Sequence, residues 1–223
     1  MYMNSKKKVL ILFSGGRDSS ATVIEMIRAG YKVKLFTYRS GFPELVGRNG
    51  DSAPDIRHKE LLNCFSEFID SDRVIKVNMY LIRKLGIEKT NKTHVVYPIV
   101  LALAIHVNAI LYCIKNNIKH IASGYSGYQA KEERYIEQHD TFCNLSRAFL
   151  AEYNIKYHTP VINKTKEEII DILEQCGISS NSLESKSVFG AVSFDINKAL
   201  EFWEESLPIC REYIKNIKFF KNE

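Results

Sequence analysis

The sequence predicts an α/β fold: a doubly wound, mainly parallel β-sheet of Rossmann-like kind with a helical C-terminal part. Three observations support this prediction. Short apolar runs alternate with stretches of helical spacing along most of the 223 residues, as in a chain of βαβ units. The first apolar run ends in a Gly-Gly turn that opens a helix. Strand, turn, helix and strand then follow one another within about 30 residues, the length of one right-handed crossover unit.

The first unit is the clearest. Residues 8–13 contain a continuous apolar run from Val9 to Phe13, which is typical of a strand buried on both faces. Residues 18–29 place Val23, Ile24 and Ile27 on one helical face, and Gly30 follows as a stop signal. Residues 31–38 predict a second strand. Residues 39–55 carry two prolines and three glycines without periodicity, which predicts a long loop.

The remaining elements follow the same alternation. Further helices are predicted at 56–68, 97–116, 140–152, 165–176 and 196–219, and further strands at 74–78, 120–124 and 157–161. Two polar stretches, 84–92 and 125–138, predict loops, the second of them at an active site. Glu168 stands three residues after Thr165, which is a capping-box pattern.

We expect residues 1–175 to form an α/β domain and residues 176–223 a helical extension packed on it. The final helix repeats apolar residues on one face, and packing onto the sheet explains this face more simply than a homodimer contact. The pattern consists of Trp203, Leu207, Cys210, Ile214 and Ile217.

Composition narrows the class of protein. With 45% hydrophobic and 26% charged residues, the chain can bury a core. Residues 95–114 are interrupted by Pro98, His106 and Asn108, which favours a buried helix over a membrane span, and we expect a cytoplasmic protein. The five cysteines are odd in number and show no Cys-x-x-Cys spacing, so neither disulfides nor zinc are expected. The net charge of +5 suits an anionic substrate and permits RNA contact.

The turn after the first strand predicts a phosphate site. Glycines there let backbone N–H groups approach a phosphate, and the following helix adds its positive end. Asp18 is the informative residue, because a carboxylate beside phosphates suits Mg²⁺ bound between ATP oxygens. The turn is neither a Walker A sequence nor Gly-x-Gly-x-x-Gly. The alternative is an ordinary Gly-Gly turn capped by Asp18. The predicted ATP-binding residues here are Ser14, Gly15, Gly16, Arg17, Asp18, Ser19 and Ser20.

The ends of three predicted strands carry residues that could form one nucleotide site. Ser14, Tyr38 and Gly124 each stand at or just past the end of a predicted strand. In open α/β sheets, ligands bind beyond the carboxyl ends of the strands, so we expect Tyr38 and Gly124 to join the ATP site. Lys164 and Lys166, at the last strand–helix junction, are predicted to reach the polyphosphate and, with Asp18, to act in catalysis. The alternative for both lysines is an exposed first helical turn.

The string Leu12-Phe13-Ser14-Gly15-Gly16-Arg17-Asp18-Ser19 resembles the pyrophosphate-binding loop of the PP-loop (N-type) ATP pyrophosphatases. This resemblance implies an adenine-nucleotide alpha hydrolase-like fold with ATP and Mg²⁺ as substrate and cofactor. It also implies the chemistry: a carboxylate or carbonyl oxygen attacks the α-phosphorus of ATP, pyrophosphate leaves, and a nucleophile such as ammonia then displaces AMP.

Three more stretches resemble one branch of that superfamily, the 7-cyano-7-deazaguanine synthases. They are residues 57–61, 124–128 and 158–169, and together with the loop they extend the resemblance over about residues 8–175, in the same order. The resemblance implies substrate contacts by Arg57, His58, Tyr125, Ser126 and Tyr128. For the first two an exposed helix start is the alternative, and for the tyrosines simple packing.

Two departures bear on the substrate. The four zinc cysteines of that family are absent near the C-terminus, and its Asp-Cys-Arg is replaced by Gln129-Ala130-Lys131-Glu132. The resemblance implies amidation of 7-carboxy-7-deazaguanine with ammonia. Because of these departures, two alternatives stay open. One is a related enzyme that joins a deazapurine to a protein or modifies tRNA. The other is a non-catalytic nucleotide-binding module, against which Asp18 argues.

Overall fold

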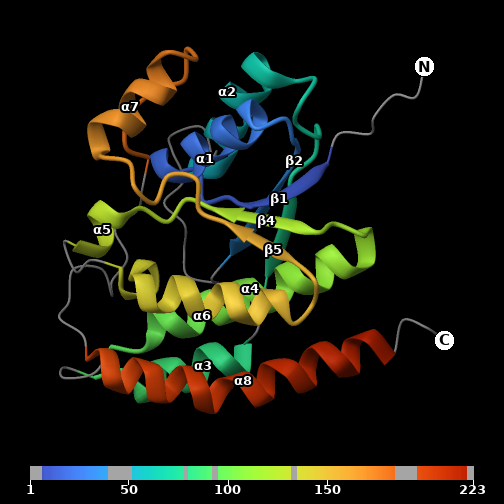
Figure 1. Cartoon of the computed structure of the whole chain (residues 1–223), viewed down its shortest axis with the longest axis vertical. Coiled ribbons are helices and arrows are strands. Elements are labelled where there is room, and N and C mark those ends of the chain that lie inside the picture. The colour runs from blue at the N-terminus through green and yellow to red at the C-terminus, as the bar shows by residue number, and fades with distance from the viewer. Residues whose placement is uncertain are drawn as a thin grey trace.

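The computed structural model describes residues 7–39, 52–77, 80–91, 95–131, 135–183 and 195–219. Its centre is a five-stranded sheet in the order β3-β2-β1-β4-β5, with every neighbouring pair parallel (Figure 1). The predicted doubly wound α/β fold is therefore confirmed. The strands are β1 (Lys8–Leu12), β2 (Lys32–Arg39), β3 (Val74–Val77), β4 (His120–Ser123) and β5 (Lys156–His158).

The strand order reverses beside β1. The chain runs outward from β1 through β2 to β3, then returns to place β4 on the opposite side of β1. This arrangement makes the β1–β4 gap the switch point, where an open parallel sheet forms its ligand crevice. The residues directly after β1 and β4 therefore face a common space at the carboxyl edge.

Helices cover both faces of the sheet (Figure 1). Side chains alternate along β1, so Leu10 joins one core while Val9 and Ile11 join the other. Burial on both faces explains why this strand is apolar from Val9 to Leu12. One face carries α1 (Arg17–Arg28), α2 (Ala53–Phe65) and α7 (Lys166–Glu174), and the other carries α4 (Tyr97–Asn116) and α6 (Asp140–Ala151), with α3 (Tyr80–Lys89) and α8 (Ile196–Phe219) outside them.

The apolar helix α4 is a core element. It is the one helix among the described residues that is long and apolar enough to cross a membrane by length and composition. However, Ile99, Leu103 and Val107 are fully buried, and the helix packs against α3, α6 and α8. Core packing therefore accounts for its apolar character, as its interruptions predicted.

The final helix adds a further layer on this side. Trp203, Cys210 and Ile214 are buried in the same core cluster as α4, and the Trp203 ring lies 6.1 Å from the Phe142 ring of α6. The apolar face of α8 is therefore buried within the chain as expected, but its main contact is with α4 and not with the sheet, on which it was predicted to pack. The homodimer and the domain boundary at residue 175 stay predictions.

Several predicted boundaries were wrong. The stretch 84–92, predicted as a loop, lies largely in α3; with Leu85 and Ile87 exposed, its apolar residues form no single buried stripe. The stretch 125–138 contains the helix α5 (Gly127–Lys131) and the 3₁₀ helix η1 (Ile136–Gln138). Helix α2 begins at Ala53, because Ser52 and Asp55 form a capping box. Strand β5 ends at His158, before a turn. Most of the predicted 39–55 loop lies outside the described residues.

Candidate active site

The loop between β1 and α1 leaves the start of the helix open. Gly16 is the N-cap residue, and among the described residues no side chain caps the helix. The hydroxyls of Ser19 and Ser20 instead donate to the Gly16 carbonyl, at 3.1 and 2.8 Å. Ser14 Oγ lies 3.1 Å from Ser19 Oγ and accepts from the Gly16 N–H. The first backbone N–H groups of α1 are thus left for a ligand, and such a helix start attracts anions.

Two glycines are required by the packing around this loop. Gly15 has a φ of +79°, and a Cβ atom there would lie 2.5 Å from Pro54 Cα in α2. A Cβ atom on Gly124 would lie 2.5 Å from the backbone nitrogen of Ser19. Gly124 therefore lets the first turn of α1 approach β4, in addition to the close approach to nucleotide predicted for it.

A cavity of about 400 Å³ opens at this point of the sheet. It contains the predicted residues Ser14, Tyr38 and Gly124, as well as Asp18 and Ser19. The expected convergence of residues from the ends of three different strands is confirmed, although Tyr38 is still part of β2 and does not follow it. The volume lies in the usual range for a small-molecule site.

Asp18 is held at the cavity by a directed chain of hydrogen bonds. The Ser126 N–H, which can only donate, donates to Gln138 Oε1 at 2.9 Å. The amide of Gln138 then donates to Gln129 Oε1 at 2.9 Å, and Gln129 Nε2 donates to Asp18 Oδ2 at 3.2 Å. Tyr128 Oη also donates to both Asp18 oxygens, at 3.2 and 3.3 Å. Each of these two side chains offers a donor to the carboxylate.

Asp18 could serve as a ligand to Mg²⁺ of the kind found in ATP-using enzymes. Mg²⁺ there is usually held by one or two carboxylates together with substrate phosphates and water. The described residues contain no group of three His, Cys, Asp or Glu side chains placed to hold a metal. An ion at this point would depend on the phosphates for its other ligands.

The segment that follows β4 contributes two buried ionisable side chains to the smaller cavity. Glu137 and Tyr125 both line the cavity. Burial raises the pKa of Glu137 to about 7, because a charged carboxylate loses its hydration there. Burial also raises the pKa of Tyr125, with a further contribution from Tyr157. Oε2 of Glu137 is enclosed, and within the described part of the chain it has no hydrogen-bond partner.

The two predicted catalytic lysines lie elsewhere. Lys164 and Lys166 line a second cavity of about 1250 Å³ beside α5 and α7. Lys164 Nζ lies 3.8 Å from Glu25 Oε2 of α1. Tyr128 lines this second cavity as well, so its hydroxyl contacts Asp18 from the side of the lysines. The structure therefore does not bring either lysine into the smaller cavity, and their contact with polyphosphate stays a prediction.

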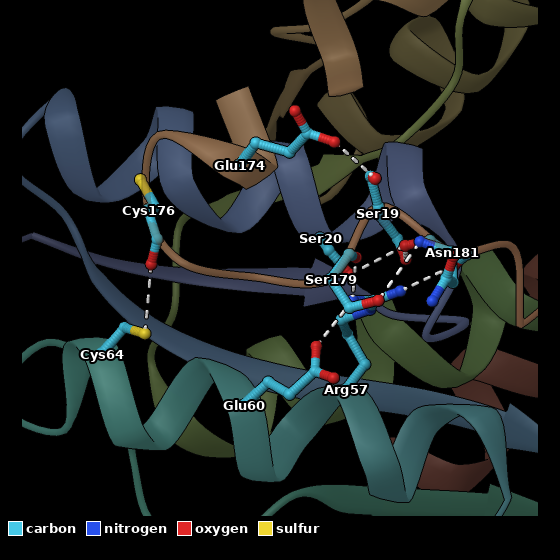
Figure 2. Close-up of polar contacts among 11 residues, drawn as sticks. Ser19, Ser20, Arg57, Glu60, Cys64, Glu174, Cys176, Ser179 and Asn181 are labelled. Carbon is cyan, nitrogen blue, oxygen red and sulfur yellow. Dashed lines mark hydrogen bonds and ion pairs between the residues drawn. The ribbon is translucent and has the colours of Figure 1, made fainter. Parts of the chain in front are cut away.

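The side chain of Arg57 makes buried structural contacts and does not line the smaller cavity. Its side chain is completely buried, and its guanidinium pairs with Glu60 at 2.6 Å. It also donates to the carbonyl oxygens of Ser179 and of Asn181, the latter at 3.0 Å (Figure 2). These bonds tie α2 to the segment after α7, and Leu183 in that segment lines the smaller cavity. The buried position of Arg57 contradicts the exposed helix start that was its alternative.

His58 and Ser126 also do not line the smaller cavity. Burial lowers the pKa of His58, and the nearby Arg73 guanidinium lowers it further. Ser126 is fully buried, and its role is the backbone bond to Gln138. Of the five predicted substrate contacts, Tyr125 is the one placed in the smaller cavity by the structure as described.

Four polar residues of the smaller cavity were not singled out by the sequence analysis. They are Gln129, Tyr135, Glu137 and Gln138, all within the stretch predicted as a polar loop. The available signal was the density of amide, carboxyl and phenol groups between a predicted strand and a predicted helix. Such a signal indicates a site without indicating which side chains face it.

Comparisons with known proteins identify a matching family and proteins of similar fold. Residues 8–187 match the model of a family described as queuosine biosynthesis protein QueC. No curated protein matches the sequence.

Among solved structures, a 4-thiouridine synthetase in complex with RNA and bound ATP is similar at 16% identity and a TM-score of 0.55. The match covers 93% of this chain but only 53% of that one. A predicted subunit of tRNA methyltransferase from Methanocaldococcus jannaschii matches over 84% of this chain and 97% of its own, at 16% identity and a TM-score of 0.44.

Proposed function

The chain belongs to the QueC family of queuosine biosynthesis proteins, and from this premise we propose that it adenylates and then amidates a 7-deazaguanine carboxylate. As a member of this PP-loop family it is an ATP-dependent enzyme. The proposed substrate is 7-carboxy-7-deazaguanine, the proposed nitrogen source is ammonia, and the proposed place of action is the cytoplasm.

The observation that carries the proposal is the position of Asp18. It lies beside the open start of α1, at the switch point of the sheet, and lines the cavity there. A helix start that binds phosphate without a Walker lysine, next to a carboxylate held by three donor contacts, fits ATP with its polyphosphate on the loop. The residues proposed to hold Mg²⁺ and phosphate are thus Asp18 and the loop around Gly15.

The reaction follows from that placement. A carboxylate oxygen of the acceptor bonds to the α-phosphorus, the bond from that phosphorus to the bridging oxygen breaks, and pyrophosphate leaves. Ammonia then bonds to the acyl carbon, and AMP leaves with the former carboxylate oxygen. The positive end of α1 stabilises the charge that develops on the leaving pyrophosphate. Mg²⁺, when bound, would neutralise part of the same charge.

The test is to incubate the protein with ATP, Mg²⁺, ammonium and 7-carboxy-7-deazaguanine and to follow products by mass spectrometry. We expect AMP and pyrophosphate in equal amounts, together with the amide and, after a second round on the amide oxygen, the nitrile. ADP and orthophosphate would overturn the proposal. Omission of the acceptor provides the control, because pyrophosphate release should then stop.

A second candidate is an enzyme of the same chemistry with a macromolecular acceptor. The observation that favours it is the larger cavity beside α5, where the family's Asp-Cys-Arg is replaced and Lys131, Lys164 and Lys166 gather. A deazapurine adduct that appears only when a protein or tRNA is added would support this candidate over the first.

A further inference from the structure

Glu137 differs from the other polar groups of the smaller cavity. Gln138, Gln129 and Asp18 satisfy one another in the chain of hydrogen bonds described above. Glu137 lines the same cavity, but its Oε2 atom has no partner among the described residues. A buried polar atom without a partner costs free energy, so it is a good candidate for contact with a ligand.

The backbone holds Glu137 firmly in place. It lies in the 3₁₀ helix η1, which packs against α4, α5 and α6. The neighbouring Gln138 is bonded at both ends of its amide, to Ser126 N–H and to Gln129. Ile136 on the other side is buried in the core. A carboxyl group fixed in this way presents a set geometry, as selective recognition requires.

The topology of the sheet assigns different sides of the smaller cavity to the two ligands of the proposed reaction, ATP and the acceptor. The phosphate loop lies at the β1–β4 gap, and in doubly wound folds the adenosine extends from this point toward the β2 side. Phe36, Thr37 and Tyr38 line that side of the cavity. Glu137 and Tyr125 line the wall that follows β4. The space next to Glu137 therefore remains for the acceptor.

Hydrogen-bond chemistry selects the kind of ring that fits. A carboxylate offers only acceptors, and it matches a ring edge with two adjacent donors, such as the ring N–H and exocyclic amine of a guanine-type ring. Adenine presents one donor beside one acceptor, an edge that suits Asn or Gln. The raised pKa of Glu137 means that a donor pair would also stabilise the ionised form of a carboxyl that is costly to ionise alone.

We propose that Glu137 is a specificity-determining residue that binds the two-donor edge of a guanine-type acceptor ring in the smaller cavity. This inference rests on the proposed function, since it places the acceptor beside the ATP site. It assigns the ring recognition to η1, a segment in which no sequence resemblance pointed to a substrate contact.

The test measures binding of two rings, separately from turnover. Calorimetric titration of 7-carboxy-7-deazaguanine and of its analogue without the 2-amino group, both with a non-hydrolysable ATP analogue, gives two dissociation constants. We expect the wild type to prefer the first ring by about 10- to 100-fold, the range for loss of a good bidentate contact. In Glu137→Gln, where an amide donor would face a ring donor, this preference should fall to about 3-fold or less, with ATP-analogue binding unchanged.

Two further variants keep the result unambiguous. Glu137→Asp retains a carboxylate and should keep the preference for the amino ring at reduced affinity, which a merely structural role would not produce. Glu204→Gln makes the same substitution at an exposed position of α8 and should behave as wild type. Equal binding of the two rings by the wild type, or an unchanged preference in Glu137→Gln, would overturn the inference. Absence of pyrophosphate release despite selective ring binding would instead contradict the proposed reaction and leave the role of Glu137 standing.

Discussion

The two cavities described above differ in a way that size alone does not reveal. The larger, about 1250 Å³, lies beside the start of α7, and the smaller, about 400 Å³, lies beside the start of α1. The start of α7 is closed by its own side chains: Thr165 and Glu168 bond reciprocally to each other's backbone N–H groups, at 2.7 and 3.2 Å. The start of α1 has no such side-chain cap in the part of the chain that the structure describes.

This comparison shows that uncapped backbone N–H groups at a helix start, more than the volume of a cavity, indicate a site for an anion. A capping box satisfies orphan N–H groups that would otherwise bind a ligand, whereas at α1 the serine hydroxyls turn away toward the Gly16 carbonyl. The charges show the same contrast. The lysines of the larger cavity share it with Asp140, Glu167 and Asp195, while the two donors to Asp18 described above, Tyr128 and Gln129, are neutral side chains.

The largest expected effect comes from Asp18. Asp18→Asn should reduce pyrophosphate release by about 1000-fold, because it removes the charge proposed to hold Mg²⁺ while keeping the shape of the side chain. Lys164→Ala, in the larger cavity, should reduce it by about 5-fold at most, the value of a partly exposed ion pair. Steady-state rates with saturating ATP measure both.

A loss of 100-fold or more in Lys164→Ala would reverse this ranking. It would mean that the lysine leaves Glu25 and reaches the phosphates, as the sequence predicted. The two cavities would then act as a single site in the presence of ATP.

The second effect concerns the loop backbone. Gly15→Ala places a Cβ atom against the backbone of α2 at a positive φ, and we expect a loss of about 3 kcal/mol or more in the free energy of unfolding. Gly30→Ala is the matched control, with a φ of +85° and nothing within 4 Å, so strain alone should cost about 1 kcal/mol. Urea denaturation checks the difference. Equal losses in the two variants would show that the contact with Pro54 contributes nothing.

The third effect is a pH dependence of stability from Glu137. Its pKa is raised to about 7 in the folded protein, so the folded state holds the proton between about pH 4.5 and 7 while the unfolded state releases it. Stability from this group is therefore present at low pH and lost as the pH rises through 7.

Comparison of wild type with Glu137→Gln isolates this effect. Between pH 5 and pH 8, the wild type should lose on the order of 1–3 kcal/mol relative to the variant in urea denaturation. The neighbouring Cys143, whose pKa burial raises to about 12, and Tyr125, whose pKa burial also raises, do not titrate in that window. Parallel pH profiles of the two proteins would show that Glu137 ionises normally.

The smallest effect should come from the capped helix. Thr165→Ala removes the capping box of α7 and should lower the free energy of unfolding by about 1 kcal/mol. Pyrophosphate release measured well below the melting temperature should stay within about 2-fold of wild type. A clear gain in phosphate binding at α7 would be informative too, because it would show that the cap alone keeps this cavity from acting as an anion site.

Much of the fold was predictable because local and tertiary signals agree. The buried run before Ser14, the glycine stop at Gly30 and the capping box at Thr165 each have a mechanism that operates within a few residues. Helix α4 was predicted with its observed bounds, since a long apolar segment between a proline and a polar turn has few other solutions.

The rest depended on contacts between distant segments. Gly124 is needed because α1 packs on β4, and Arg57 is buried because a segment more than 120 residues later crosses α2. In the stretch 125–138, Gln129 and Gln138 face inward because their amides form a chain that starts at Ser126 and ends at Asp18. Such a series of hydrogen bonds leaves no periodic pattern in the sequence, and for this reason the stretch was predicted as a loop.

The central claim is that an acceptor oxygen attacks the α-phosphorus of ATP at the Asp18 cavity. The most direct measurement uses 7-carboxy-7-deazaguanine labelled with ¹⁸O in its carboxylate, with ATP, Mg²⁺ and ammonium, followed by mass spectrometry of the released nucleotide. The account predicts AMP that carries one ¹⁸O atom, with unlabelled pyrophosphate. ADP with labelled orthophosphate, or AMP without label, would contradict it.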